Sequence, residues 1–344
     1  MSRKLKAGIA VLIGLTILGA ILYRAAPVQD ALMRAGAAAA LSNVPETFDG
    51  LQVVVCGSAS PLGNNPDRAQ ACLAVITPEH FFLVDVGARS PMRIAQAQLP
   101  MNRLTAVMLT HFHSDHIAGL ADVNLASWVA GRRASMQVYG PEGVETVVAG
   151  FNQAYRLDRG YRVAHHGEKL LPRSAGPMQA NTFQPGLVWQ DDNMTVTSFL
   201  VDHRPIDPAV GYRFDYRGRS VVISGDTNAS NSLFAAAAGA DIVFHDALAR
   251  DSLDIMQNVM AESGRSGIAQ IIADVTDYHA DTRVLEEAAN AAGIEQLVLY
   301  HLVPTPMNSL TETMFLRGLS DKTLLAHDLQ VFELPPESEE ITIR

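Results

Sequence analysis

The sequence contains few cysteines and little positive charge. Its two cysteines, Cys56 and Cys72, do not have the spacing of a metal site. Its 26 Lys and Arg residues are outnumbered by 36 Asp and Glu residues, which gives a formal net charge of −10. This balance disfavours bulk attraction to a nucleic-acid backbone, so nucleic acid is not an expected partner. Repeats with a period of roughly 20–50 residues are also lacking, which argues against solenoids and propellers.

Long apolar runs are limited to one, from Ala7 to Tyr23, and three basic residues precede it. A basic head followed by an apolar body is typical of an export signal. The run is slightly shorter than a comfortable membrane span of about 20 residues, and Arg24-Ala25-Ala26-Pro27 offers no clean small-x-small cleavage site. We therefore expect residues 1–23 to be an uncleaved signal anchor, with a removed signal peptide as the alternative.

Positive charge concentrated at the N-terminus keeps that end of a chain in the cytoplasm. In a bacterium the rest would lie on the periplasmic face of the inner membrane, or free in the periplasm if the signal is removed. Residues 24–48 are expected to form a linker with an alanine-rich stretch. Because 48% apolar and 18% charged residues are ordinary for a globular protein, residues 49–344 should form the folded domain.

Cys56 and Cys72 fall in the first two predicted strands, which could neighbour each other as a hairpin. An oxidising compartment would permit a disulfide between them. The alternative is a pair of buried thiols, which pack like small hydrophobic side chains.

Short apolar runs bounded by Gly, Pro, Asn or Asp predict buried strands at 52–55, 72–76, 81–84, 106–109, 194–197, 210–214, 220–223, 242–244 and 297–300. Helical spacing occurs at 92–98, 121–130, 144–156, 233–238 and 283–292. Strands clustered in each half, with helices between and after them, predict an α+β fold with two sheets faced by helices. Residues 216–219 predict a hairpin turn, and residues 162–184 a long loop or lid.

The most informative segment is Thr110-His111-Phe112-His113-Ser114-Asp115-His116. A strand that ends just before it would present His111 and His113 on the same side, because side chains alternate along an extended chain. Asp115 and His116 would follow on the turn into a helix. Four ligand-type side chains within six positions are hard to explain as packing. Imidazole and carboxylate together suit zinc, iron or manganese, with zinc as the default.

This string resembles the His-x-His-x-Asp-His motif of the metallo-β-lactamase superfamily, and downstream residues are similar to that family's remaining ligands in the same order. His203, in Asp202-His203-Arg204-Pro205, is similar to the third histidine of the first metal. Asp226, which follows Ser224-Gly225, is similar to the carboxylate that bridges both metals. His301, which follows Leu299-Tyr300, is similar to the last ligand of the second metal.

The resemblance implies an αββα sandwich, in which two packed mixed β-sheets are flanked by helices and two metal ions lie in a cleft at one edge. It implies two groups of ligands that share Asp226: His111, His113 and His203 for one metal, and Asp115, His116 and His301 for the other. Two zinc ions are the expected cofactors, with manganese or iron as alternatives. In such paired sites a bridging water is acidified to hydroxide and becomes the nucleophile, which Asp115 would orient.

Aspartate at position 226 carries chemical information, because the β-lactamases of this superfamily usually have a cysteine there. A bridge of oxygen atoms is harder than one of sulfur and suits hydrolysis of phosphodiesters, sulfate esters, thioesters or lactones. Cleavage of antibiotics is therefore not expected.

Two further motifs resemble the ribonuclease Z and phosphodiesterase branch of the superfamily. His245-Asp246-Ala247 is similar to its His-Glu-Ala-Thr loop, and Tyr278-His279-Ala280-Asp281-Thr282 is similar to its His-x-Thr element. The resemblance implies that His279 is the general acid that protonates the leaving oxygen, with Asp246 and His245 supporting it. Asp replaces Glu and Leu248 replaces Thr in the first motif, and ordinary capping or surface histidines are the alternative.

Other polar residues are open to two interpretations. His165 and His166, in the predicted lid, either contact substrate or are merely solvated. Asp85, which ends a predicted strand, either accepts a hydrogen bond from a metal-binding histidine or forms a turn.

The leading hypothesis is an exported, membrane-anchored dinuclear zinc hydrolase of small phosphodiesters or sulfate esters, similar to the phosphodiesterases and arylsulfatases of the superfamily. Its partners would be a small-molecule ester and the inner membrane, and a homodimer is compatible with the sequence. One alternative is a ribonuclease Z-like endonuclease that processes the 3′ end of tRNA. Others are a lactonase or thioesterase, and a metal-binding scaffold with a degenerate site.

Overall fold

The computed structural model describes residues 5, 8–9, 16, 19, 23–42 and 47–344. The chain divides into two units, Met1–Glu46 and Thr47–Arg344. In the first unit, helix α2 (Ala26–Ser42) takes up most of the predicted linker. Most of the predicted anchor at residues 1–23 lies outside the described residues. Within the described part of the chain, none of the helices has both the length and the apolar character needed to cross a membrane.

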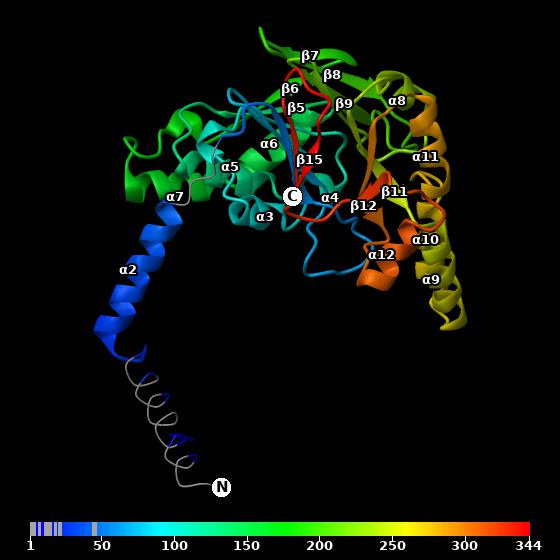
Figure 1. The fold of residues 1–344 in the computed structure, drawn as a ribbon. Coiled ribbons are helices and arrows are strands. Elements are labelled where there is room, and N and C mark those ends of the chain that lie inside the picture. Colours follow the sequence, from blue (N-terminus) through cyan, green and yellow to red (C-terminus); the bar gives the residue numbers. More distant parts are fainter. Residues whose placement is uncertain (1–4, 6–7, 10–15, 17–18, 20–22, 43–46) are drawn as a thin grey trace. The chain divides into compact units, whose positions relative to one another are not determined.

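The second unit contains two β-sheets (Figure 1). In the first, the strands lie in the order β15 (Thr342–Ile343), β14 (Val331–Leu334), β1 (Leu51–Gly57), β2 (Cys72–Ile76), β3 (Phe81–Val84), β4 (Ala106–Met108), β5 (Met136–Gly140) and β6 (Met178–Thr182). In the second, they lie in the order β13 (Thr323–Leu325), β12 (Gln296–Val303), β11 (Ile242–Leu248), β10 (Arg219–Ile223), β9 (Val210–Tyr216), β8 (Met194–Leu200) and β7 (Gly186–Gln190).

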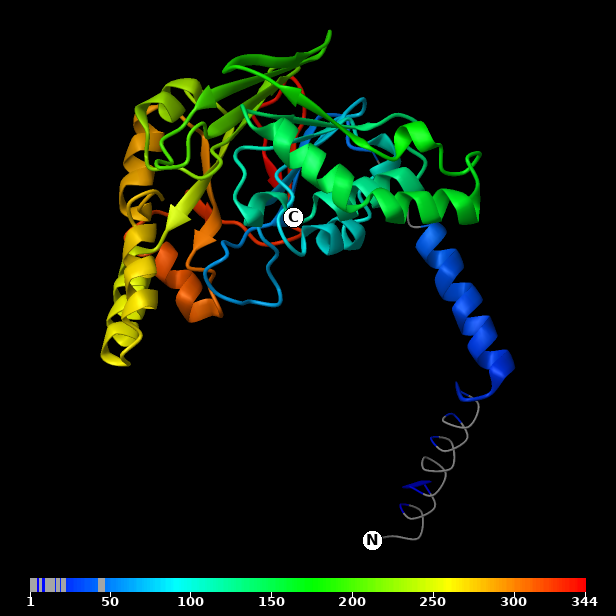
Figure 2. The ribbon, with the colours of Figure 1, turned by 180° about the vertical axis from the view of Figure 1, so that it is seen from behind.

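Helices cover the outer face of each sheet. The first sheet is flanked by α3 (Ser90–Gln96), α4 (Ser114–Ile117), α5 (Leu120–Val129), α6 (Val144–Ala154) and α7 (Arg156–His166). The second is flanked by α8 (Asn231–Ala236), α9 (Arg250–Glu262), α10 (Ser266–Val275), α11 (Thr282–Ala291) and α12 (Ser309–Phe315). Figure 2, seen from behind, shows the same two groups of helices on opposite sides of the sheets.

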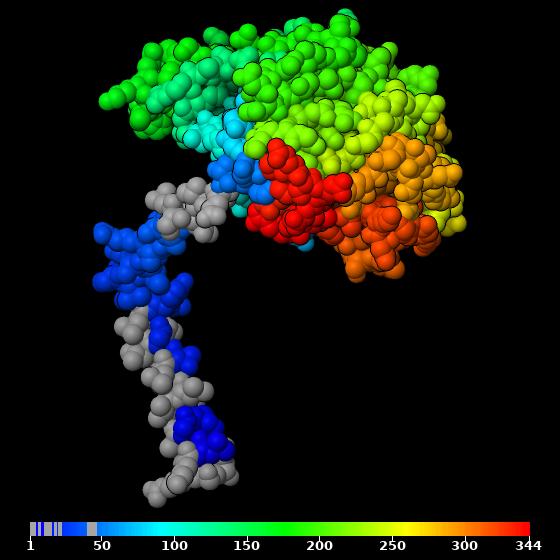
Figure 3. All heavy atoms as spheres, turned by 45° about the horizontal axis from the view of Figure 1, so that its top comes forward, coloured from blue at the N-terminus to red at the C-terminus, as the bar shows by residue number. Residues whose placement is uncertain are grey.

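The largest apolar cluster lies between the two sheets, with Val53 and Phe82 from one sheet and Phe214, Phe244 and Val298 from the other. Separate clusters pack each sheet against its own helices. This arrangement confirms the predicted α+β sandwich of two mixed sheets with helices outside. The C-terminal strand β14 pairs with β1, the first strand of this unit, and Figure 3 shows the C-terminal segment in red beside blue atoms from early in the same unit.

The predicted turn at residues 216–219 joins β9 to β10, with Arg217 and Gly218 both at positive φ, as a tight hairpin requires. The structure differs from the sequence predictions in two places. Residues 162–184 are not a long loop, because α7 extends to His166 and β6 begins at Met178. Helices α9 and α10 were not predicted, although they pack on each other as a hairpin.

Candidate active site

Strand β4 carries the motif at residues 110–116 to the carboxyl edge of the first sheet. It pairs in parallel with β3 and β5, so the segments that follow these strands emerge at the same edge. The backbone of His113 is extended and caps the short helix α4, which holds Asp115 and His116. His111, Asp115 and His116 are buried, and His113 is half-buried. The local sequence therefore folds as its pattern predicts.

The second sheet supplies the remaining three ligand candidates. His203 lies in the segment between β8 and β9, and Asp226 follows β10. The sequence predicted that His301 directly follows a strand. It lies instead inside β12, at a β-bulge where Tyr300 pairs with Asp246 and Leu302 pairs with Ala247. Its φ of 42° lies in the left-handed region. Such bulges redirect a side chain, and here the bulge places the imidazole in the site.

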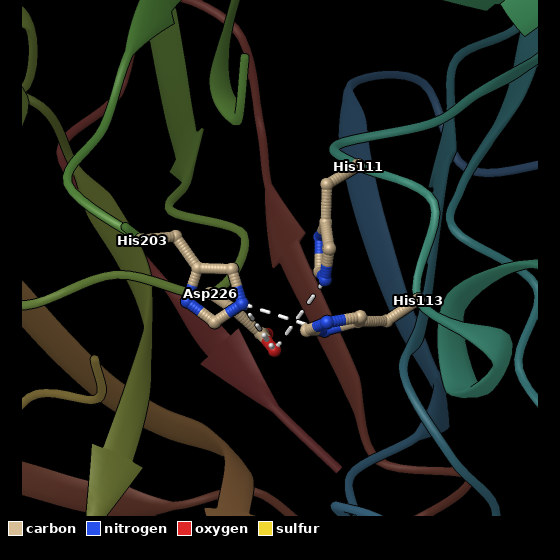
Figure 4. Close-up of side chains that lie close together, drawn as sticks. All are labelled: His111, His113, His203 and Asp226. Carbon is tan, nitrogen blue, oxygen red and sulfur yellow. Dashed lines mark hydrogen bonds and ion pairs between the residues drawn. The ribbon is translucent and has the colours of Figure 1, made fainter. Parts of the chain in front are cut away.

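The side chains from the two sheets converge. The ligand atoms of His111, His113, His203 and Asp226 lie within 4.8 Å of one another, and Figure 4 shows these four side chains pointing to a common centre. Asp226 Oδ2 is 3.8 Å from Nε2 of both His111 and His203. We call these four residues the first ligand group.

The second ligand group consists of Asp115, His116, His301 and, again, Asp226, with ligand atoms within 4.8 Å of one another. Asp226 Oδ2 lies 3.2 Å from His116 Nε2, and Asp226 Oδ1 lies 3.3 Å from His301 Nδ1. Asp115 Oδ2 lies 3.1 Å from His301 Nε2. The shared aspartate thus faces both groups with its two oxygens.

Both groups suit metal ions. Four of their buried atoms have no hydrogen-bond partner: His111 Nε2, His116 Nε2, Asp226 Oδ1 and His301 Nδ1. Buried polar atoms are normally paired, so a cluster of nitrogen and oxygen atoms without partners in the protein is suited to bind a cation. Imidazole nitrogen and carboxylate oxygen are the donors that zinc prefers outside cysteine-rich sites.

Asp85 fixes the orientation of one histidine from each group. Its Oδ2 accepts hydrogen bonds from His116 Nδ1 and from Thr110 Oγ1, both at 2.8 Å. Thr110 Oγ1 in turn accepts from His111 Nδ1 at 3.1 Å. These contacts leave Nε2 of both rings free to face the site, which is the usual role of a carboxylate behind metal ligands. Of the two interpretations of Asp85, the geometry supports the acceptor.

The two groups differ in electrostatics. Burial lowers the pKa of His111 and of His203, so both imidazoles stay neutral. Burial would also lower the pKa of His116, but the carboxylates of Asp226, Asp115 and Asp85 outweigh it and raise that pKa well above its ordinary value. In the same way, His116 and His301 overcome the burial of Asp115 and lower the pKa of its carboxyl group.

His279 and Asp246 form a hydrogen-bonded pair next to both groups. His279 Nδ1 donates to Asp246 Oδ2 at 2.6 Å, and the backbone N–H of Thr227 donates to the same oxygen at 3.0 Å. Burial would lower the pKa of His279, but Asp246 outweighs it and raises that pKa. Ligand atoms of the pair lie within 4.8 Å of those of Asp226 and His301. Asp246 therefore favours the protonated form of His279 at the edge of the site.

His245 does not join this pair. It precedes Asp246 on β11, so the alternation of side chains points it to the opposite face of the sheet. There it is fully buried, its ring stacks 5.8 Å from that of Phe234, and its Nδ1 donates to the backbone oxygen of Asp246 at 2.7 Å. The structure thus gives His245 a place in the packing of α8 rather than at the reacting centre.

A cleft of about 210 Å³ opens onto the two groups. Four of its lining residues belong to the site or adjoin it: His113, Asp115, Tyr278 and His279. Two are serines, Ser60 and Ser114, and four are apolar: Pro61, Leu62, Val275 and Val303. His165 and His166 are exposed at the end of α7 and do not line this cleft.

Tyr278 and the loop at residues 58–71 were not predicted as parts of the site. The backbone oxygen of Tyr278 accepts a hydrogen bond from His203 Nδ1 at 2.9 Å, and the neighbouring His279 was the signal that could have pointed to it. The loop carries Ser60, Pro61 and Leu62, and no ligand-type pattern marks it. A disulfide between Cys56 and Cys72 closes the loop at its base, so the bridge, rather than two free thiols, is present.

Comparisons with known proteins agree with this geometry. Residues 80–302 match the profile of the beta-lactamase superfamily domain. Ribonuclease Z of Mycobacterium bovis (strain BCG / Pasteur 1173P2) is 36% identical over 257 residues, which cover 74% of this chain and 86% of that protein.

Two solved structures show a similar fold. The metallo-beta-lactamase fold protein YhfI from Bacillus subtilis has a TM-score of 0.59 and 18% identity, covering 83% of this chain and 100% of its own. The short form of human tRNase Z has a TM-score of 0.57 and 17% identity, covering 83% of this chain and 99% of its own. At these identities the likeness establishes the fold alone.

Proposed function

The chain belongs to the beta-lactamase superfamily, and on this premise we propose that it is a phosphodiesterase of the ribonuclease Z type, dependent on two zinc ions and acting on RNA. Metal-dependent hydrolysis is the activity common to the family. The observation that carries the proposal is the His279–Asp246 pair beside the two ligand groups. A proton donor at this place serves an alcohol that leaves poorly without a proton, as the alcohols of a phosphodiester do.

His111, His113 and His203 would hold one ion and Asp115, His116 and His301 the other, with Asp226 shared. Bound in this way, the ions would acidify a water molecule and neutralise negative charge on the substrate. Asp115 lines the cleft and has a lowered pKa. Its ionised carboxylate can therefore accept a hydrogen bond and orient an attacking water.

His279 would donate its proton to the leaving oxygen. Its Nδ1–H is held by Asp246, so the proton on Nε2 is the one available to the substrate. The raised pKa keeps this proton in place near neutral pH. After transfer, the neutral imidazole remains bound to Asp246 and can regain a proton from water.

RNA as the substrate is supported by the name of the relatives, ribonuclease Z, which are similar over most of both chains. Because the net charge is −10, the sequence did not predict nucleic acid as a partner. Net charge does not describe a local surface, however, and α7 carries three arginines and two histidines against one aspartate. This helix offers the local positive charge that a phosphate backbone requires.

A small phosphodiester or sulfate ester is the second candidate, favoured by the Cys56–Cys72 disulfide. Disulfides persist mainly in oxidising compartments, which lie away from cytoplasmic RNA. As part of this second candidate, and in line with this bond and the basic, apolar N-terminal segment, we propose that the chain is exported and held at the periplasmic face of the inner membrane. Protease added to intact spheroplasts should then degrade the folded unit, whereas full protection would contradict export.

The zinc-loaded, full-length protein should be offered a tRNA precursor with a 3′ trailer, bis(p-nitrophenyl) phosphate, p-nitrophenyl sulfate and an aliphatic lactone. We expect cleavage of the precursor and of the phosphodiester, lost on chelation and restored by zinc. Turnover of the small phosphodiester or the sulfate without the precursor would favour the second candidate. Turnover of the lactone alone would defeat both.

A further inference from the structure

Tyr278 brings an aromatic ring to the active-site cleft, directly beside the proposed proton donor. The residue is half-buried, and its ring centroid lies 4.9 Å from that of His279 and 5.1 Å from that of His203. The planes of these two rings are inclined to it by 50° and 83°. Neither imidazole therefore covers the face of the phenol as a parallel stack would. Because Tyr278 also lines the cleft, part of its ring is available to a ligand.

The contacts that hold the site together at this point come from the backbone of Tyr278 and from its neighbours, not from its phenol ring. The backbone oxygen of Tyr278 accepts a hydrogen bond from His203 Nδ1 at 2.9 Å. The next residue, His279, is held by Asp246 at 2.6 Å. Orientation of the histidines thus does not require an aromatic side chain at position 278, and the ring is free to serve another purpose.

Aliphatic side chains line the same cleft as this ring. Leu62 and Val275 are half-buried, Val303 is buried, and Pro61 is exposed. Leu62, Val275 and Val303 belong to one apolar cluster with the buried Ile272 of α10. This packing fixes the aliphatic surface before a substrate arrives. An aromatic ring together with fixed aliphatic side chains suits a planar group of low charge.

The groups next to this surface suit a phosphate. The pKa of His279 is raised, and the two ligand groups, which would hold the metal ions, adjoin the same cleft. The negative charge of a phosphodiester would therefore be balanced there. Burial and then the negative charge of Asp226 raise the pKa of Tyr278, so its phenol stays neutral and does not repel the phosphate. A charged place and an uncharged aromatic place thus lie side by side, like the phosphate and the base of a nucleotide.

We infer that Tyr278 is a stacking platform for the base of the nucleoside that carries the leaving oxygen. His279 delivers its proton to that oxygen, and the ring of Tyr278 lies against the ring of His279. The base nearest to Tyr278 therefore belongs to the nucleoside that receives the proton. Stacking on an aromatic ring is open to all four bases, because each of them has a π-face. The inference rests on the proposed activity on RNA and adds a substrate-binding residue to it.

A double-mutant cycle between protein and RNA tests the platform in the zinc-loaded, full-length protein. One substrate is a tRNA precursor with a 3′ trailer, and the other lacks only the base of the nucleotide that carries the leaving oxygen. That nucleotide is identified by the product that ends in a hydroxyl group rather than a phosphate. For the wild type, removal of this base should lower kcat/KM by about tenfold. The loss should appear mainly in KM, because stacking contributes to binding and not to the chemical step.

Tyr278→Ala completes the cycle. It should lower kcat/KM on the intact precursor by a similar factor, and removal of the base should then have little further effect. Tyr278→Phe keeps the ring and should retain the sensitivity of the wild type to the base. The control Leu187→Ala alters a residue that is 59% exposed on β7, outside the cleft, and should behave as the wild type. Zinc content and thermal unfolding show whether each variant is folded, and Tyr278→Leu replaces Tyr278→Ala if the latter is not.

The possible failures are distinguishable. If removal of the base costs the wild type and folded Tyr278→Ala the same factor, the platform is overturned and the proposed activity on RNA stands. The same conclusion follows if the wild type depends only on the base at the other side of the scissile phosphate. If the wild type cleaves neither precursor but hydrolyses bis(p-nitrophenyl) phosphate, the proposed activity on RNA itself is overturned, and the platform with it.

Discussion

The two ligand groups share Asp226 but differ in the side chains around it. The first has three imidazoles and one carboxylate, whereas the second has two imidazoles and two carboxylates. Burial lowers the pKa of His111 and of His203, whereas three carboxylates raise the pKa of His116 against its burial. The first group is thus ready to bind a cation, whereas a cation that binds the second group competes with a proton on His116. Histidines of the two groups therefore differ in pKa because their neighbouring side chains differ.

Removing the shared carboxylate should have the largest effect, because it breaks both groups at once. Asp226→Ala should lower kcat/KM by at least about 10⁴-fold, since two bound ions supply several kcal/mol of transition-state stabilisation. Metal analysis should show fewer than two ions per chain. The matched control is Asp215→Ala, which removes a half-exposed carboxylate paired with Arg213. Two retained ions with full activity would refute the shared-ligand assignment.

The second prediction concerns the proton donor, which lies near the second group through His301. His279→Ala should lower the rate on an alkyl phosphodiester by about 10²–10⁴-fold and that on a p-nitrophenyl ester far less, because only a poor leaving group needs the proton. Activity should decline at alkaline pH as His279, with its raised pKa, loses its proton. This alkaline decline should disappear in the variant. Equal losses on both esters would contradict the acid role.

A third change should separate the two groups through Asp85. Asp85→Asn weakens the acceptor for His116 Nδ1 and should reduce the metal affinity of the second group by about 10–100-fold, and that of the first group less, because Asp85 reaches His111 only through Thr110. Thr110→Val removes the acceptor of His111 Nδ1 but leaves the contact between Asp85 and His116 in place, so it should mainly weaken the first group. Metal titration followed by histidine NMR signals would measure this. A larger loss of affinity at the first group in Asp85→Asn, or at the second group in Thr110→Val, would mean that the ligand assignment is wrong.

The smallest expected effect is on the stability of the chelated protein. His116 has a raised pKa in the folded state. It therefore stabilises the fold fully below its ordinary pKa of about 6.5, and this contribution is lost as pH rises through the folded pKa. His116→Gln should consequently cost more unfolding free energy at pH 6 than at an alkaline pH above the folded pKa of His116, measured by urea unfolding.

His111→Gln is the control for that experiment, because its pKa is lowered. In the wild type, a neutral buried His111 costs stability as pH falls below about 6.5, where the unfolded chain binds the proton. Its replacement should therefore improve relative stability at low pH. A pH dependence of the same sign in both variants would contradict the electrostatic difference between the groups.

Much of this site was predictable because its ligand residues occur in short sequence motifs. Four ligand-type residues in Thr110–His116 are hard to explain as packing alone, and the structure brings them together as their spacing predicts. The disposition of His245 was harder to foresee. Whether a strand residue faces the site or the opposite helix depends on which face of β11 meets the cleft, and a one-residue shift reverses it.

Other features leave weak signals in the sequence. Helices α9 and α10 were not predicted, although Leu253 and Ile272 on them pack in one cluster with three residues that line the cleft, Leu62, Val275 and Val303. The lid predicted at 162–184 is in fact the end of α7, η2 (Arg173–Ala175) and β6. Gly, Pro and His lower local propensity for regular structure, but contacts with neighbouring elements overrode it.

By itself, the sequence predicted two sheets faced by helices and a histidine- and aspartate-rich site, because strand periodicity and ligand chemistry are local properties. The resemblance to the metallo-β-lactamase superfamily added that the sheets pack as a sandwich with the site at one edge. Only the tertiary structure decided that Asp226 faces both ligand groups, that a bulge turns His301 into the site, and that Asp85 lies behind both His111 and His116. The reason is physical: the two halves of the site come from different sheets, and the distances between them are set by the packing of those sheets.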